Sequence, residues 1–102
     1  MSKYGNIKTV VDNITFDSKK EAARYQHLKL LQKAGGIDRL KLQPKFPIEV
    51  NGKKICTYVA DFSYYYSPAD LVVEDVKGMK TPVYNLKKKL VKAIYGIEIQ
   101  EI

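Results

Sequence analysis

The chain has 102 residues, a length that predicts a single compact domain over residues 1–102 with a modest hydrophobic core. Hydrophobic residues make up 45% of the sequence, which excludes an intrinsically disordered chain. The formal net charge is +7, and this excess of lysine and arginine favours a polyanionic partner such as nucleic acid.

Cysteine and histidine are too scarce for several kinds of site. Cys56 is the only cysteine and His27 the only histidine, so an intramolecular disulfide and a zinc site with several Cys or His ligands are excluded. A reduced, cytoplasmic setting fits this composition. No apolar run approaches the roughly 18 residues of a membrane span. No signal peptide is visible either, so we expect no membrane association.

The N-terminal residues 1–13 are polar and mixed, and they are expected to form an arm or a short hairpin. Residues 7–11 suit a short strand, which turns at Asp12 into a second strand over residues 14–16. The segment is either a loosely held terminus or an arm that contacts DNA. The side chains that would suit such an arm are Lys3, Tyr4 and Lys8.

A first helix is predicted over residues 18–34. Asp17 or Ser18 can cap it, and Glu21 follows Ser18 three residues later, as in a capping box. Glu21 also borders the apolar stripe of the helix. Its carboxylate therefore either belongs to the cap or is an acidic group that a packed helix directs at an active site. The apolar stripe comprises Ala22, Tyr25, Leu28, Leu31 and Ala34.

Two strands are predicted over residues 37–50 and 53–58. Pro44 interrupts the first, because proline cannot donate a ladder hydrogen bond, so we expect a bulge or bend there. Asn51-Gly52 is a strong signal for a two-residue hairpin turn between the two strands.

Residues 58–66 and 71–77 are predicted to form two central antiparallel strands, each with an acidic residue in an apolar or aromatic run. A carboxylate is costly to bury unless a cation or a partner charge offsets the loss of water. Asp75 and Lys77 share a face because side chains alternate along a strand, and Asp61 joins them if the register allows. Two carboxylates and an ammonium group on one face suit metal-assisted phosphodiester hydrolysis.

The register of this hairpin decides whether the three side chains meet. A three-residue loop over residues 67–69 pairs Asp61 with Asp75, and a five-residue loop pairs Asp61 with Lys77. Both registers keep the two acids on one face. A regular four-residue loop would place them on opposite faces.

A second helix is predicted over residues 82–95, with Thr81 as its cap and Gly96 after its end. Lys87 lies on the apolar stripe, so it either snorkels from a packed face or points its charge at the acidic pocket. A final strand over residues 97–102 requires a crossover and makes the sheet mixed. The apolar positions of the helix are Val83, Leu86, Leu90, Ala93 and Ile94.

In combination, these features resemble the PD-(D/E)xK nuclease superfamily: a helix with Glu21, a strand with Asp61, a strand with Asp75 and Lys77, a basic helix and a last strand. Within it, the chain is similar to small, Holliday junction resolvase-like proteins of phages and prophages. The motifs of this second likeness are KYGN at residues 3–6, FDSKKEA at 16–22, QPKF at 43–46, YVADF at 58–62, EDVKG at 74–78, and Thr81 with Lys87.

The resemblance implies a restriction-endonuclease-like αβββαβ core, in which two helices flank a mixed central sheet. It implies that Asp61 and Asp75 ligate Mg²⁺ or Mn²⁺ with help from the Val76 carbonyl. Lys77 would orient or activate the attacking water, and Glu21 would hold a ligand or a metal-bound water.

Basic residues would bind the DNA. By the same resemblance, Lys87 matches a basic residue of the helix that follows the D-x-K motif, whose charge points to the active site. The remaining lysines, Lys80 and Lys88 among them, would follow the phosphate backbone and make binding salt-dependent.

Two departures from the superfamily pattern bear on the ligands. Ala60 stands where the signature has proline, and Asp75 stands where glutamate is more usual. Glu74 is adjacent and would be the ligand if the strand were shifted, but strand parity favours Asp75 because it shares a face with Lys77.

We therefore expect a Mg²⁺-dependent DNA endonuclease of a phage recombination or repair module. It would act in the cytoplasm of the host cell as a homodimer on branched DNA, such as a four-way junction. One alternative is a non-catalytic DNA-binding protein with a degenerate nuclease fold, which would bind DNA in EDTA without cutting it. Another is a phage protein that binds a host protein, which would show no salt-dependent affinity for DNA.

Overall fold

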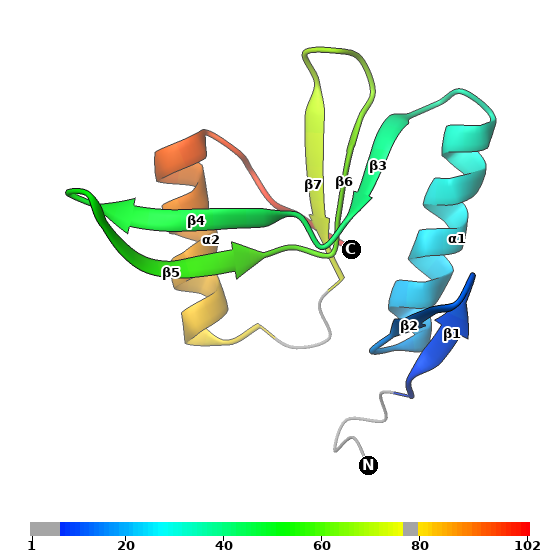
Figure 1. Cartoon of the computed structure of the whole chain (residues 1–102), viewed down its shortest axis with the longest axis horizontal. Helices are drawn as coiled ribbons and strands as arrows, with labels where there is room; N and C mark the ends of the chain where they lie inside the picture. The colour runs from blue at the N-terminus through cyan, green and yellow to red at the C-terminus, as the bar shows by residue number, and fades with distance from the viewer. Residues whose placement is uncertain (1–6, 77–79) are drawn as a thin grey trace.

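The computed structural model describes residues 7–76 and 80–102, a part of the chain that forms two helices and eight short strands (Figure 1). Neither helix is long and apolar enough to cross a membrane. The elements are β1 (Thr9–Val11), β2 (Ile14–Phe16), α1 (Lys19–Lys33), β3 (Asp38–Leu42), β4 (Lys45–Val50), β5 (Lys53–Val59), β6 (Phe62–Tyr65), β7 (Leu71–Asp75), α2 (Pro82–Tyr95) and β8 (Gln100–Glu101).

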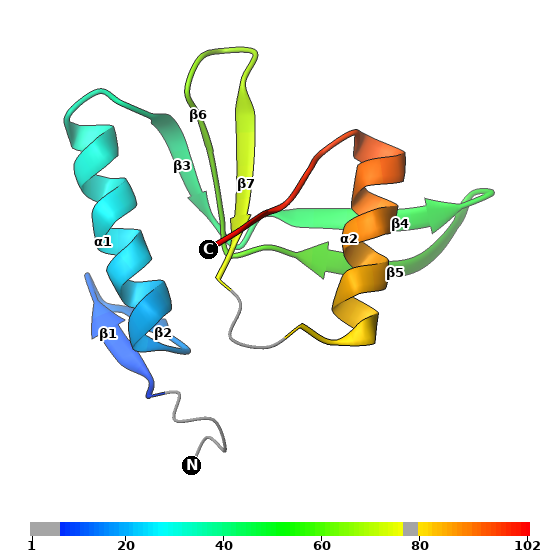
Figure 2. The same ribbon diagram turned by 180° about the vertical axis from the view of Figure 1, so that it is seen from behind.

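The strands β3 to β6 form one long antiparallel hairpin that is bent in the middle. Leu42 pairs with Phe62 on one side of the bend and Lys45 pairs with Val59 on the other, so the register is the same on both sides. The bend falls at the predicted break, where Gln43 has a positive φ of 50°. It turns β4 and β5 away from β3, β6 and β7 (Figures 1 and 2).

The prediction of one strand over residues 58–66 is wrong, because the same bend divides this segment into β5 and β6. Ala60 and Asp61 lie between the two strands and still bond across the hairpin. The Ala60 N–H donates to the Pro44 carbonyl (3.1 Å), and the Gln43 N–H donates to the Asp61 carbonyl (2.9 Å). Asp61 consequently lies at the corner where the two arms of the hairpin diverge.

The four-stranded sheet has the order β3-β6-β7-β8 and is mixed, as predicted. The first three strands are antiparallel neighbours, whereas β8 returns after α2 and pairs with β7 in parallel. The last strand is shorter than the predicted 97–102, because only residues 100 and 101 pair with β7.

The two helices pack on opposite faces of this sheet and form separate cores. Phe62 and Tyr64 point to α1, and Val73 points to α2 together with the β4–β5 arm. The first core consists of Phe16, Ala22, Tyr25, Leu28, Ile37, Phe62 and Tyr64, and the second of Ile48, Tyr58, Ala60, Val73, Tyr84, Val91 and Ile99.

Helix α2 buries a different face from the apolar stripe of its sequence. Tyr84 and Val91 are buried, whereas the side chains of Val83, Leu86 and Ile94 are 62%, 58% and 44% exposed. A tyrosine ring buries more apolar area than an aliphatic side chain, and its hydroxyl can still take a hydrogen bond. The tyrosine side of the helix therefore faces the core.

Glu74 lies on the α1 face of β7 with only 1% of its surface exposed. Arg24 of α1 donates to both of its carboxylate oxygens, from Nε at 2.7 Å and from a terminal nitrogen at 2.5 Å. The Tyr64 hydroxyl also donates to it. The hydrogen bond with Glu74 raises the pKa of Arg24, against the lowering effect of burial. This carboxylate thus joins α1 to the sheet.

Replacement of Arg24 by Met should lower the free energy of unfolding by about 3 kcal/mol or more, because Glu74 would lose its cation while still buried. Urea unfolding at neutral pH, followed by circular dichroism, measures the change. The matched control is Arg39→Met, since Arg39 pairs with Asp38 on the surface and stacks on Tyr65. It should cost about 1 kcal/mol or less. Equal losses in the two variants would contradict the role given to Glu74.

Candidate functional site

Asp61 and Asp75 face each other at the end of the β6–β7 hairpin. Phe62 is the last residue of β6 that pairs with β7, opposite Glu74, and the Asp61 N–H before it also donates to the Glu74 carbonyl at 3.1 Å. The Asp61 and Asp75 carboxyl groups are hydrogen-bonded to each other. Of the loops considered, the structure has the three-residue loop over residues 67–69. Asp75 alternates with Glu74 along β7 and so points to the α2 side, and its hydrogen bond with Asp61 brings the Asp61 carboxyl group to the same place.

Both acids are withdrawn from water. Asp75 is only 1% exposed, and Asp61 is half-buried. The Val76 N–H donates to Asp61 Oδ2 at 2.7 Å, and the Tyr58 hydroxyl donates to Asp75 Oδ2. These two donors fix the orientation of the carboxyl groups, but neither carries a positive charge.

The surroundings of Asp61 disfavour its charged form. Burial raises the pKa of Asp61 to about 8, with help from its hydrogen bond to Asp75 and from the charges of Asp75 and Glu21. The Val76 N–H acts in the opposite direction. Asp61 therefore keeps its proton at neutral pH, which is the electrostatic condition that a bound divalent cation relieves.

Glu21 approaches the pair from the first turn of α1. Its backbone N–H donates to Ser18 Oγ at 3.1 Å, so Ser18 caps the helix as predicted. Its carboxylate is close enough for its charge to raise the pKa of Asp61. Glu21 thus has its backbone in the helix cap and its charge directed at the acidic pair, which joins the two interpretations of this residue.

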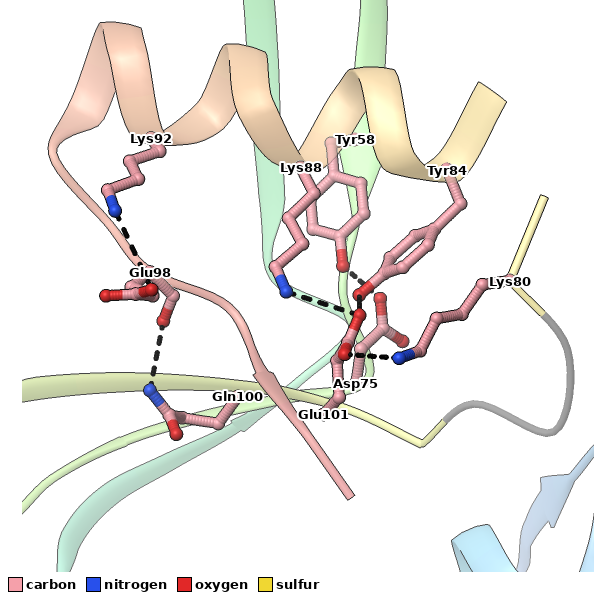
Figure 3. A network of polar contacts seen from close by, with 9 residues as sticks. All are labelled: Tyr58, Asp75, Lys80, Tyr84, Lys88, Lys92, Glu98, Gln100 and Glu101. Atoms are coloured by element: carbon pink, nitrogen blue, oxygen red, sulfur yellow. Dashed lines mark hydrogen bonds and ion pairs between the residues drawn. The ribbon is translucent and has the colours of Figure 1, made fainter. Parts of the chain in front are cut away.

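Two tyrosines lie on the α2 side of the pair, and neither is predicted from the sequence. Burial and then the hydrogen bond to Asp75 raise the pKa of Tyr58. The Tyr84 hydroxyl donates to Glu101 Oε2 at 2.8 Å, and after burial and Glu101 the charges of Asp75 and Asp61 raise its pKa. The Tyr84 hydroxyl therefore lies near both acids, and Figure 3 shows it beside Asp75. The one sequence signal is that a buried tyrosine needs a hydrogen-bond partner.

The lysines expected to bind DNA lie in different places. Lys80 and Lys88 both pair with Glu101, at 2.9 and 3.3 Å. Lys87 instead directs its Nζ to the Thr57 carbonyl of β5 at 3.5 Å, so it snorkels along the β4–β5 arm. Of these lysines, Lys80 and Lys88 lie on the side of the acidic pair. Lys88 belongs to α2, and Lys80 immediately precedes the cap residue Thr81.

Three further site residues predicted from the sequence, Lys3, Tyr4 and Lys77, lie outside the described residues. Lys8 is described and is exposed immediately before β1.

The oxygen donors of Asp61 and Asp75 suit a hard cation such as Mg²⁺, which is commonly held by one or two carboxylates and keeps several waters. In the part of the chain with assigned positions, no three Asp, Glu, His or Cys side chains gather at metal-binding spacing. Glu21 would therefore act from further away, through water. Val76 contacts the pair through its N–H, whereas the resemblance had implied its carbonyl.

The chain belongs to a protein family, DUF1064, described as of unknown function, whose model matches residues 1–100. No curated protein and no solved structure matches the chain.

The free energy of unfolding should fall as pH rises, because of the raised pKa of Asp61. Its ordinary pKa is 3.8 and its folded pKa is about 8, so between these values the folded state holds a proton that the unfolded state has lost. Stability is then lost as pH rises, by at most about 1.4 kcal/mol per pH unit and by less because Asp61 is partly exposed.

Asp61→Asn should remove this slope. Urea unfolding from pH 4 to 9 without divalent cations measures it, with Asp38→Asn, a change at an exposed acid, as the control. An unchanged slope in the Asp61 variant would contradict the shifted pKa.

Proposed function

We propose that this member of the DUF1064 family is a Mg²⁺- or Mn²⁺-dependent endonuclease that hydrolyses phosphodiester bonds in DNA. The pair of Asp61 and Asp75 carries this proposal, because the two carboxyl groups are hydrogen-bonded to each other and withdrawn from water, a setting in which a divalent cation would favour the charged form of Asp61. The element order supports a PD-(D/E)xK fold. β3 and β4 are the two halves of one bent strand, and β5 and β6 are the two halves of another. With each bent strand counted once, the elements after β2 are α1, three strands, α2 and β8.

Each residue of the site has a part in this proposal. Asp61 and Asp75 would hold the metal ion, which when bound supplies an ionised water near neutral pH and neutralises charge on the phosphate. The Tyr58 hydroxyl and the Val76 N–H hold the two carboxyl groups in orientation. Glu21 would accept a hydrogen bond from a water at the site.

Lys77 is assigned to the proposed site from the sequence alone. It follows Asp75 by two residues, the D-x-K spacing of the resemblance on which this part of the proposal rests. An ammonium group there would orient the attacking water and offset the charge of the phosphate.

The substrate and assembly are narrower proposals. The net charge of +7 favours DNA, and the resemblance to phage resolvases favours a branched substrate such as a four-way junction. A homodimer would present two sites, one for each strand to be cut. Sedimentation velocity with and without a junction would measure the stoichiometry.

Purified protein should cut a labelled four-way junction with Mg²⁺ or Mn²⁺ and should not cut it in EDTA. Asp75→Asn should lower the rate by about 10²-fold or more, because the loss of several kcal/mol of charge stabilisation has that effect. Linear duplex of the same sequence tests the preference for branches, and Asp38→Asn is the matched acid-to-amide control. Binding without cutting would replace the nuclease with a non-catalytic DNA-binding protein. Neither binding nor cutting would leave the host-protein alternative.

Metal binding can be measured without activity. Mg²⁺ at about ten times its Kd should stabilise the wild type by about 1.4 kcal/mol, which raises the Tm by several degrees in a domain of this size. Asp61→Asn and Asp75→Asn should lose this rise in differential scanning fluorimetry. If the Tm of both variants rises with Mg²⁺ as in the wild type, the two acids are not the ligands.

A further inference from the structure

Three hydrogen-bond donors converge on the carboxylate of Glu101 (Figure 3). Lys80 Nζ lies 2.9 Å from Oε1, and Lys88 Nζ and the Tyr84 hydroxyl lie 3.3 and 2.8 Å from Oε2. Tyr84 and Lys88 are four residues apart and share a face of α2, while Lys80 precedes the Thr81 cap. Two elements therefore present two cations and a hydroxyl to one anion.

The charged side chains of this cluster are partly exposed to solvent, unlike Glu74, whereas Tyr84 packs in the core. The side chains of Lys80, Lys88 and Glu101 are 55%, 32% and 22% exposed. The hydrogen bonds from Lys80 and Tyr84 lower the pKa of Glu101 to about 2, with a smaller effect of Lys88. Glu101 is consequently a full anion at neutral pH, and an external anion can reach the same donors.

The cluster is next to the acidic pair. Glu101 on β8 pairs with Asp75 on β7, and adjacent strands are about 4.8 Å apart. The Tyr84 hydroxyl donates to Glu101, and the charges of Asp75 and Asp61 also act on it, so this group lies near both Glu101 and the pair. A phosphate bound by the cluster would thus be a neighbour of the phosphate that a metal ion at Asp61 and Asp75 would bind.

We propose that Lys80, Lys88 and the Tyr84 hydroxyl form a site for a backbone phosphate of DNA, and that the Glu101 carboxylate fills this site in the free protein. A phosphodiester group has the same charge as a carboxylate and presents oxygens to the same donors. DNA must displace Glu101 to use the site. This inference rests on the proposed function, because it takes DNA as the partner, but it does not depend on cleavage.

A purely structural role is the competing explanation. β8 is only two residues long, and the contacts of Glu101 hold it against α2. That role predicts that loss of the charge lowers stability and leaves DNA binding as it was. Glu101→Gln separates the two, because glutamine keeps the size and can still accept the Tyr84 hydrogen bond.

Glu101→Gln should bind duplex DNA more tightly than the wild type in fluorescence anisotropy with EDTA, about tenfold at low salt. The slope of log K against log salt should steepen by about 0.9, the value for one further neutralised phosphate. The matched control is Glu98→Gln, since Glu98 pairs with Lys92 in the same segment and loses the same charge. Equal affinities and slopes in the two variants would overturn the proposal.

A second pair of variants serves if Glu101→Gln does not fold. Lys88→Gln in the wild type should make the slope shallower by about 0.9. Arg39→Gln, a change at an exposed cation of β3 that pairs with Asp38, should leave it nearly unchanged. Equal slopes in the Lys88 and Arg39 variants would count against a phosphate site at Lys88.

The two proposals fail in different ways. Cleavage by the wild type together with equal binding by Glu101→Gln and Glu98→Gln would remove the phosphate site and keep the nuclease. Tighter binding by Glu101→Gln without any cleavage would keep the phosphate site and remove the nuclease. No DNA binding by any variant at low salt would overturn both.

Discussion

Two consecutive carboxylates on a buried strand impose the constraint on which the rest of the fold depends. Side chains alternate along β7, so Glu74 and Asp75 point to opposite faces, and each needs its own partners. Glu74 requires a cation, and Arg24 of α1 supplies it. Asp75 receives a hydroxyl from β5 and faces Asp61. One strand thereby joins both cores. The two acids have different partners, because Glu74 pairs with a cation and Asp75 is hydrogen-bonded to a hydroxyl and to a second carboxyl group.

The helices and turns could be predicted because their signals are local. Ser18 and Thr81 cap the helices through their own side chains, and Gly96 ends α2 in the left-handed conformation that glycine adopts freely. The Asn51-Gly52 turn likewise needs positive φ at both residues, and it has 51° and 76°. The meeting of Asp61 and Asp75 could be predicted only on condition of the loop length, since a loop of three or five residues keeps the two acids on one face and a regular loop of four does not.

What could not be predicted depends on contacts between distant segments. Nothing local divides residues 58–66; the bend comes from the partner strand at Gln43. The buried side of α2 is chosen by the aromatic ring of Tyr84, which lies 6.3 Å from that of Tyr58. The partner of Lys80 and Lys88 is a residue on the last strand, so neither the periodicity of the helix nor its charge could identify Glu101.

The β4–β5 arm contains an irregularity with a practical consequence. Ile48 pairs with Cys56, but Glu49 pairs with Lys54, so one strand has an extra residue before the turn. Such a bulge interrupts the ladder, and a small change of length at the tip can be absorbed there without a shift of the register nearer the bend. The tip lies roughly 25 Å of strand from Asp61. A fluorophore or an affinity tag inserted at the tip should therefore leave the geometry of the acidic pair intact, which makes this turn the natural attachment point for single-molecule work on the protein.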